Sequence, residues 1–288
     1  MRNYLLFVIC YLLFFTSCSS APKKPPEVFA DRNTAANQLN LANLYAARGR
    51  YDDALRFLDE ARRLALSTDD PSLRIKTAMS RGSILFSLGR HDEAFSVWED
   101  AHIEGDVSGE PVLAAQVRIY VIRARLVLLA NESEAAGSAQ NQIVDGYKSR
   151  LQAEMATVRS DPLSVAAGYV TLGFAEKQLR RWAEAEAAIK QALAIHEKDY
   201  HLEDAAYDWY VIASVRSVAG NYSGALDALW MAIGFDRRAE NGFGLASSWQ
   251  AMGDVHLKTG NSAEASSAYR RAADIYKAIG LTGPAEKP

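Results

Sequence analysis

The chain has 288 residues, with 32 lysines and arginines against 35 aspartates and glutamates, so its formal net charge is −3 at pH 7. This slightly acidic balance lacks the basic excess that binds nucleic acid, and we expect no nucleic-acid partner. The chain has only two cysteines, and one of them, Cys10, lies in an apolar leader, so a core and not disulfides must stabilise the rest of the chain.

The first 17 residues are typical of a secretory signal peptide. Arg2 is the only charge among them, and the apolar run Tyr4–Phe15 is 12 residues long. A membrane-spanning helix needs about 20 apolar residues, so this run is short for a span. The small residues Thr16 and Ser17 suit a peptidase cut directly after them. We therefore predict a signal peptide over residues 1–17.

The run Phe15-Thr16-Ser17-Cys18 resembles a bacterial lipobox. The resemblance implies that acyl chains such as palmitate are attached at Cys18, which becomes the new N-terminus. The alternatives are an uncleaved anchor and an ordinary signal peptide. Residues 18–30 are rich in proline and serine, which predicts a flexible tether. Ser19 is not the aspartate associated with inner-membrane retention, so the expected location is the cell envelope, at the outer membrane and facing the periplasm.

The body of the chain carries five similar segments, starting at Leu41, Arg81, Leu172, Ile212 and Met252. Each segment has a small residue, a turn residue seven positions later, two alanines and a large residue between those alanines. The small residues are Ala42, Gly82, Gly173, Ala213 and Gly253; the turn residues are Gly49, Gly89, Arg180, Gly220 and Gly260; the large residues are Leu58, Trp98, Ile189, Leu229 and Tyr269.

This pattern predicts a helix–turn–helix unit that recurs about every 40 residues. A small residue in the first helix lets the second helix approach closely, and glycine ends the first helix where φ is positive. Such a unit cannot bury its apolar face alone, so it stacks on its neighbours. The pattern predicts an all-α chain.

The landmarks resemble those of the tetratricopeptide repeat (TPR), which implies a right-handed superhelical solenoid over residues 31–280. The expected repeats are about 33–70, 71–109, 110–160, 161–200, 201–240 and 241–280, followed by a disordered tail over 281–288. We expect the third repeat to be degenerate and to form two long helices over 111–159. In this interpretation Ala124 is its small residue, Asn131 replaces its turn glycine and Ala136 is its second-helix alanine. Residues 102–109 read as a loop.

Catalytic patterns are not visible in the sequence, and we expect no enzyme, no cofactor and no metal. Gly242-Phe243-Gly244 follows no strand, so we interpret it as a turn. His196, Asp199 and His201 are close in sequence and would suit a metal in principle, but a spacing of five does not place both histidines on one helical face. The preferred interpretation is the solvated end of a second helix.

In the TPR family the first helices of the repeats line a concave, partner-binding surface. Projected onto this chain, that surface includes Leu39, Asn43, Met79, Ser83, Phe86, Val121, Arg125, Leu128, Phe174, Lys177, Tyr207, Tyr210, Ser214 and Asp254. Of these we predict partner binding by Met79, Phe86, Arg125, Phe174, Lys177, Tyr207 and Tyr210. The alternative is that longer helices pack differently and that these residues are core.

The resemblance implies a non-enzymatic, membrane-anchored adaptor or scaffold that binds envelope proteins. TPR lipoproteins serve pilus assembly, outer-membrane assembly, cell-wall enzymes and solute transport, and the residues do not choose among these. The alternative function is a periplasmic protein that holds a small apolar or peptide ligand in its groove.

Overall fold

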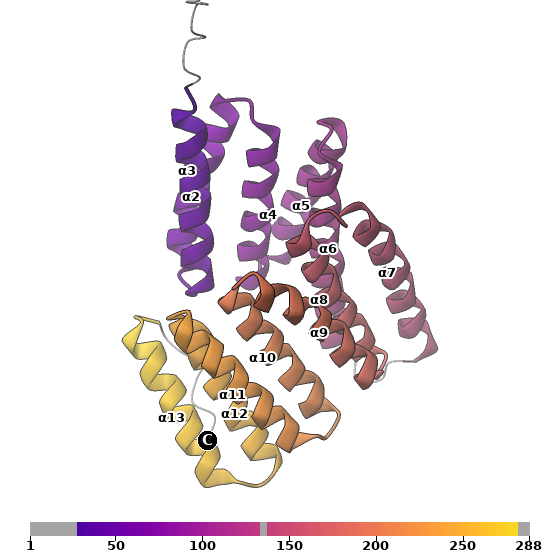
Figure 1. Cartoon of the computed structure of the whole chain (residues 1–288), viewed down its shortest axis with the longest axis vertical. Coiled ribbons are helices and arrows are strands. Elements are labelled where there is room, and N and C mark those ends of the chain that lie inside the picture. Colours follow the sequence, from indigo (N-terminus) through magenta and orange to yellow (C-terminus); the bar gives the residue numbers. More distant parts are fainter. Residues whose placement is uncertain (1–27, 133–136, 282–288) are drawn as a thin grey trace, which may run out of the picture. The chain divides into compact units, whose positions relative to one another are not determined.

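The computed structural model describes residues 28–132 and 137–281, and within these ranges every regular element is a helix. The contacts within the chain define two compact units, one that ends at Ala30 and one that begins at Asp31. The second unit, which we call the body, is described below. Consecutive helices form six pairs (Figure 1): α2 (Ala30–Ala47) with α3 (Tyr51–Ser67), α4 (Pro71–Ser87) with α5 (His91–Val107), α6 (Pro111–Glu132) with α7 (Ser138–Thr157), α8 (Pro162–Gln178) with α9 (Trp182–Lys198), α10 (Leu202–Val218) with α11 (Tyr222–Arg238), and α12 (Gly242–Lys258) with α13 (Ser262–Ala278).

Proline and acidic residues mark the helix starts. Pro71, Pro111 and Pro162 are the first residues of α4, α6 and α8, where the missing N–H of proline costs no helical hydrogen bond. Asp70 caps α4, since its side chain accepts a hydrogen bond from Leu73 N at 3.0 Å. The second helices α3 and α5 carry acids in their first turns, where carboxylates interact favourably with the helix dipole.

The tight turn inside a helix pair requires a left-handed residue. Gly49, Gly89, Gly220 and Gly260 have φ between 70° and 82°, as the repeat pattern predicted. Arg180 occupies the same place between α8 and α9 with a φ of 57°. Left-handed backbone costs a residue with a Cβ roughly 1–2 kcal/mol, so Arg180 is a strained position.

Arg180→Gly is expected to stabilise the protein by roughly 0.5–1 kcal/mol, because relief of this strain exceeds the entropy that glycine adds to the unfolded chain. Urea unfolding would measure it. Gly220→Ala is the reciprocal control: an added Cβ there would meet nothing within 4 Å, so any loss of stability is conformational. Unchanged midpoints in both variants would contradict this account of the turns.

The core lies between the two helices of each pair and between neighbouring pairs. The large residues Leu58, Trp98, Ile189, Leu229 and Tyr269 are all buried. Three of them fill the space over a first-helix glycine: Trp98 lies over Gly82, Ile189 over Gly173 and Tyr269 over Gly253. The sequence predicted this exchange of small and large residues, which lets the two helices approach closely.

The third pair departs from the predicted details. Two long helices were expected, and α6 and α7 are 22 and 20 residues long. However, Asn131 is not a turn residue, because α6 continues through it to Glu132. The small residue Ala124 is buried. Ala136 lies outside the described residues.

The predicted loop over residues 102–109 was wrong. Helix α5 continues to Val107, and only the last positions form the turn. The physical reason is Gly105, where an added Cβ would lie 2.9 Å from Ala114 Cβ of α6. This glycine serves close helix packing and not chain reversal, a distinction that composition alone does not make.

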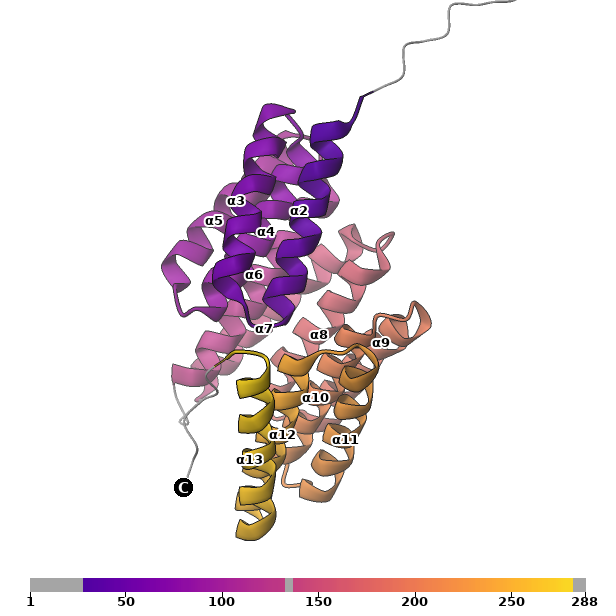
Figure 2. The ribbon, with the colours of Figure 1, turned by 90° about the vertical axis from the view of Figure 1, so that its left-hand side faces the viewer.

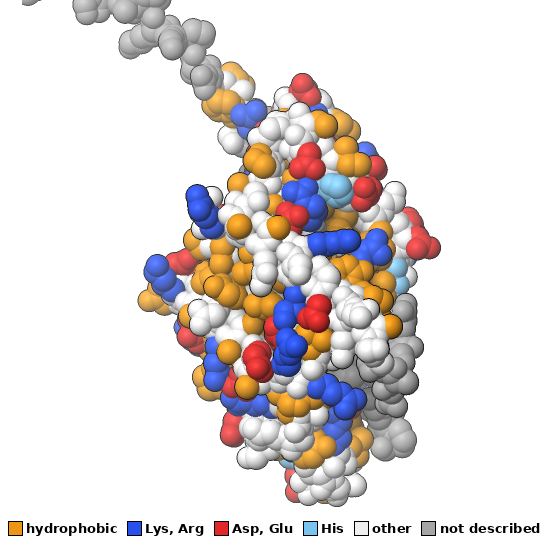
Figure 3. All heavy atoms as spheres, turned by 90° about the vertical axis from the view of Figure 1, so that its right-hand side faces the viewer, with side chains coloured by type: hydrophobic (Ala, Val, Ile, Leu, Met, Phe, Trp, Pro, Cys, Tyr) orange, Lys and Arg blue, Asp and Glu red, His pale blue; other side chains and the backbone are white. Residues whose placement is uncertain are grey.

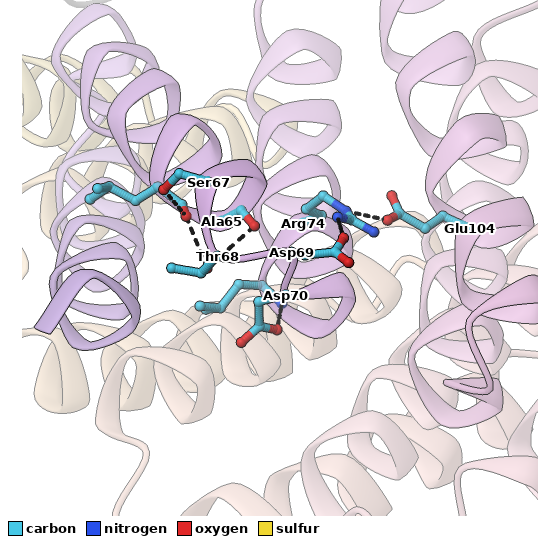
Figure 4. A network of polar contacts seen from close by, with 9 residues as sticks. Ala65, Ser67, Thr68, Asp69, Asp70, Arg74 and Glu104 are labelled. Atoms are coloured by element: carbon cyan, nitrogen blue, oxygen red, sulfur yellow. Dashed lines mark hydrogen bonds and ion pairs between the residues drawn. The ribbon is translucent and has the colours of Figure 1, made fainter. Parts of the chain in front are cut away.

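A polar network ties the first two pairs together at one corner (Figure 4). Arg74, near the start of α4, has Nη1 2.7 Å from Asp69 Oδ1, and its Nε pairs with Glu104 of α5. The neighbouring Asp70 accepts from Arg32 Nε of α2 at 2.7 Å. Because these groups come from α2, α4 and α5, they fix the ends of three helices relative to one another.

Residues 1–27, with the predicted signal peptide and Cys18, lie outside the described residues, as does the predicted tail from 282 on. In the part of the chain that the structure describes, none of the helices has the length and apolar character needed to cross a bilayer.

The stacked pairs curve, so that the turn after α2 comes back to the last pair (Figures 1 and 2). A Cβ added at Gly49 would lie 2.8 Å from the Phe243 ring of α12 and 2.9 Å from Leu281. The first and last repeats of the body are therefore in contact.

Candidate functional site

Three hollows lie on the face formed mainly by the first helices of the pairs. Their volumes are about 370, 320 and 150 Å³. The first and second hollows share Ala46 in their walls, and the first and third share Tyr210. The three are therefore neighbours on one concave surface.

The largest hollow, which we name the seam pocket, lies where the first repeat meets the last ones. Its walls are Ala46 and Ala47 of α2, Glu203, Asp204, Ala206, Tyr207 and Tyr210 of α10, Asp236 of α11, Asn241 before α12, and Phe243, Gly244, Ser247 and Ser248 of α12. Residues from opposite ends of the sequence thus form one pocket.

Asp236 is the most buried acid of the seam pocket, with 2% of its surface exposed. Its Oδ1 accepts a hydrogen bond of 2.8 Å from Asn241 Nδ2. Burial raises the pKa of Asp236 to about 7, the bond from Asn241 opposes the rise, and Glu203 adds to it. A carboxyl of this kind changes its charge near neutral pH.

Glu203 carries a second perturbed carboxyl. Burial raises its pKa, Asp204 raises it further, and Arg48 in the turn after α2 lowers it. Glu203 and Asp204 belong to the first turn of α10, where the helix dipole favours negative charge. The seam pocket therefore combines three acids with aromatic walls.

Glycine at position 244 is required by this arrangement. Gly244 N donates to Asn241 Oδ1 at 3.1 Å, so that Asn241 caps α12. A Cβ at Gly244 would lie 2.3 Å from Asp236 Oδ1. The capping asparagine and the buried acid can therefore meet only because residue 244 has no side chain.

Two lysines lie on the same face beyond Tyr210. Lys177 Nζ donates to Ser214 Oγ at 2.7 Å, and Lys258 Nζ donates to Ser217 Oγ at 3.0 Å. Ser214 and Ser217 are one turn apart on α10, so the two ammonium groups come from α8 and α12 to one stripe. Burial lowers the pKa of Lys177, and the charge of Lys258 lowers it further.

Four of the predicted partner-binding residues lie on or beside this surface. Tyr207, with 45% of its surface exposed, and Tyr210 line the seam pocket. Met79 lines the 320 Å³ hollow. Lys177 reaches α10 through Ser214.

The other predicted residues make packing contacts. Phe86 packs between α4 and α5 against Phe95 and Trp98, with ring centroids 6.4 and 6.1 Å away. Phe174 packs against three core clusters. Arg125 is exposed, and its guanidinium carbon lies 4.5 Å from the Phe95 ring centroid.

Leu39 was expected on the exposed face and is buried with 8% of its surface accessible, so that prediction was wrong. It packs in a cluster with Leu58 and Ile84. Helices of 17 or more residues extend the inter-helix contact beyond the shorter repeat that the projection assumed.

The prediction of a solvated helix end at His196 was also wrong. His196 is buried, and its Nδ1 lies 2.6 Å from Oδ2 of Asp208, which is fully buried. Burial raises the pKa of Asp208 to about 6, while His196 lowers it. The described ranges 28–132 and 137–281 contain no cluster of three or more His, Cys, Asp or Glu residues that could hold a metal ion.

Sequence reasoning missed Glu203, Asp236 and Phe243. Glu203 in a first helical turn looks like a helix-capping acid. Phe243 lies in the motif that we interpreted as a turn, whereas the structure places Gly242-Phe243-Gly244 in the first turn of α12. The short spacing from Asp236 through Asn241 to Gly244 is the signal that could have indicated a polar contact there.

Positive and negative side chains are interspersed on the face drawn in Figure 3, with apolar side chains between them. This face has no uniformly basic area of the kind that tracks a nucleic-acid backbone.

Comparisons with known proteins agree with the helical repeat. The tetratricopeptide repeat family matches residues 31–101, 165–198 and 246–279. The first segment covers almost all of the first two helix pairs, and each of the other two covers most of one pair. None of these matches is to a catalytic family. A search of curated proteins found no match.

Solved structures share the fold at low identity. BtubC (BKLC) from P. vanneervenii is 16% identical, with a TM-score of 0.51 over 90% of this chain and 96% of that one. A Rap protein complexed with Competence and Sporulation Factor is 14% identical, with a TM-score of 0.55 over 86% of this chain and 67% of that one. The apo form of RapI is 11% identical, with a TM-score of 0.52 over 85% of this chain and 66% of that one.

Six stacked helix pairs with a pocketed face define an all-α solenoid. Such solenoids present extended concave surfaces to other molecules. The repeat is identified by its landmarks and by the three matched segments: residues 31–101, 165–198 and 246–279 carry tetratricopeptide repeats, within an all-α fold of the tetratricopeptide-repeat kind.

Proposed function

We propose that this protein is a scaffold of the bacterial cell envelope that binds partner proteins on its concave surface and is anchored through a lipidated Cys18. The observation that carries the scaffold function is the concave surface itself, on which three neighbouring hollows follow the first helices. Tyr207 and Tyr210 lie there at least partly accessible, and tyrosine is enriched among residues that dominate protein interfaces. The lipobox-like run before Cys18 supports the anchor.

The surface is tested by crosslinking the protein in its own cells, pulling it down and identifying partners by mass spectrometry. We expect a reproducible envelope partner whose yield falls at least fivefold with Tyr210→Ala, because an interface tyrosine commonly contributes more than about 1 kcal/mol. Tyr200→Ala is the matched control, since Tyr200 is 79% exposed and lies outside the three hollows. A partner that is lost equally with both variants, or with neither, would contradict the proposed surface.

The anchor is tested by membrane fractionation. Cys18→Ser is expected to move the protein from the membrane pellet to the supernatant, because stable anchoring needs acyl chains that the serine cannot carry. If the variant still sediments with membranes after a high-salt wash, the proposed lipid anchor is incorrect. Separation of inner from outer membranes of cells with the wild-type protein tests the proposed location.

A ligand-binding protein is the second candidate function, and the seam pocket favours it. Its volume of about 370 Å³ lies at the low end of the range of about 300–1,000 Å³ that is usual for small-molecule sites. The Rap protein of the related fold was solved in complex with Competence and Sporulation Factor. A small molecule that co-purifies with the protein, in the absence of any protein partner, would favour this candidate.

A further inference from the structure

We propose that the seam pocket binds a ligand cation, an ammonium or guanidinium group, between its carboxylates and its aromatic rings. The group can belong to a free small molecule or to a lysine or arginine side chain of a partner. For the side-chain source the inference rests on the proposed scaffold function, whereas for the free cation it does not.

The charge of the pocket walls favours a cation. Glu203, Asp204 and Asp236 line the pocket, and no lysine or arginine is among its wall residues. Arg48 lies near Glu203, but its effect on the pKa of Glu203 is smaller than those of burial and of Asp204. The described walls are therefore negative overall when these acids are ionised.

Asp236 brings a buried carboxyl to the wall of the pocket. The carboxyl is nine-tenths or more buried, and Asn241 Nδ2 is its one hydrogen-bond donor among the described residues. That bond uses Oδ1 and accounts for a structural role, since it positions the cap of α12. It leaves Oδ2 without a donor, in a residue that lines the pocket. This oxygen is therefore open to a hydrogen bond from a donor that enters the pocket.

The aromatic walls add a second attraction for the same group. Tyr207 and Tyr210 line the pocket from α10, and Phe243 lines it from α12. A cation within about 6 Å of an aromatic ring centroid is attracted to the ring face, by more when water is excluded. Acids and rings together select a cation with a short apolar stem over a fully hydrated metal ion.

The end of α2 gives the pocket its selectivity for shape. Ala46 and Ala47 contribute small side chains there, and Gly49 lies against Phe243. The pocket thus exists only while the first and last repeats are in contact. A cation bound there would contact three repeats at once and would hold the superhelix closed.

Isothermal titration calorimetry on the full-length protein in a nonionic detergent tests the proposal. Agmatine represents the free cation, the blocked tripeptide acetyl-Ala-Arg-Ala-amide represents the side chain, and acetyl-Ala-Gln-Ala-amide is the neutral control. We expect at least one arginine-type probe to bind at millimolar or lower concentration and the glutamine peptide to bind at least tenfold more weakly. Binding of agmatine alone assigns a free cation, and binding of the peptide assigns a partner side chain.

Variants locate the binding. Asp236→Asn removes the charge and keeps the shape, and we expect at least tenfold weaker binding. Tyr210→Phe keeps the ring and should bind like the wild type, whereas Tyr210→Ala should bind more weakly. Asp100→Asn, at an exposed acid of α5, is the charge-matched control and should change nothing. If Asp236→Asn fails to fold, Glu203→Gln is the second test of the same charge.

Three results overturn the inference: neither cation binds the wild type, the neutral peptide binds as well as the charged one, or Asp236→Asn and Glu203→Gln bind like the wild type. None of these bears on the crosslinked partners, so this inference can fail while the scaffold function stands. Equally, failure to find a protein partner would contradict the scaffold function and would not affect the test of agmatine binding.

Discussion

Gly82→Ala is expected to destabilise the protein by about 2 kcal/mol, whereas Gly234→Ala is expected to stabilise it by about 1 kcal/mol. Both glycines lie inside a helix, Gly82 in α4 and Gly234 in α11. Their intrinsic helix propensities therefore change in the same way. The opposite signs come from the surroundings of the two positions.

The surroundings of Gly82 leave no room for a methyl group. A Cβ there would lie 2.3 Å from Nε1 of the buried Trp98. Trp98 cannot simply move away, because its Nε1 donates to Met79 O at 3.1 Å. Overpacking of this kind costs typically 1–3 kcal/mol, and loss of the indole hydrogen bond adds to the cost.

Gly234 is exposed, and an added Cβ would meet nothing within 4 Å. Alanine there gains only helix propensity, about 1 kcal/mol. Urea-unfolding midpoints and slopes of both variants and the wild type give the two free energies. Equal effects of the two substitutions would show that Trp98 does not limit the size of the side chain at position 82. That result would contradict the close packing of Gly82 and Trp98 described above.

We compare the free energy of unfolding of Asp236→Asn with that of the wild type at two pH values. The variant minus wild-type difference is expected to be about 2 kcal/mol more positive at pH 8 than at pH 5. The folded-state pKa of Asp236 is about 7, well above its ordinary value of 3.8. A raised pKa means that the folded state holds the proton more tightly than the unfolded state. Its stabilisation is complete below pH 3.8 and is lost as the pH rises through 7.

The asparagine variant has no such titration, and its side-chain oxygen can still accept the bond from Asn241. The coupled pair His196 and Asp208 titrates in both proteins, so its contribution cancels in the comparison. Unfolding in urea at half-unit steps from pH 5 to 8 measures the difference. A difference that stays constant over this range would show that Asp236 titrates normally.

Glu186→Gln provides a control with the opposite kind of shift. The hydrogen bond from Arg216 lowers the pKa of Glu186 to about 2, so the carboxyl remains ionised at every pH of the experiment. Its stabilisation is present above the unfolded-state pKa of about 4.5 and is lost only as the pH falls toward 2. The free-energy difference between Glu186→Gln and the wild type should therefore be nearly independent of pH from 5 to 8.

The sequence by itself determined the repeat. The small and large residues and the turn glycines act within one helix pair, and each predicted its place correctly. Such patterns report on contacts between residues a few turns apart. Leu39 and residues 102–109 show the limit, because helix length and the close approach at Gly105 depend on neighbouring pairs.

Only the tertiary structure decided the seam pocket. Gly49 and Phe243 meet because each pair is rotated slightly relative to the one before, and these small rotations add up along the solenoid. No local pattern encodes that sum. The start of α12 lies against the end of α11 at Asp236, so that an acid at the end of a second helix, which reads as a solvated surface residue, becomes a buried carboxyl with a pKa near neutrality. Its burial, and not its identity, makes it a candidate binding residue.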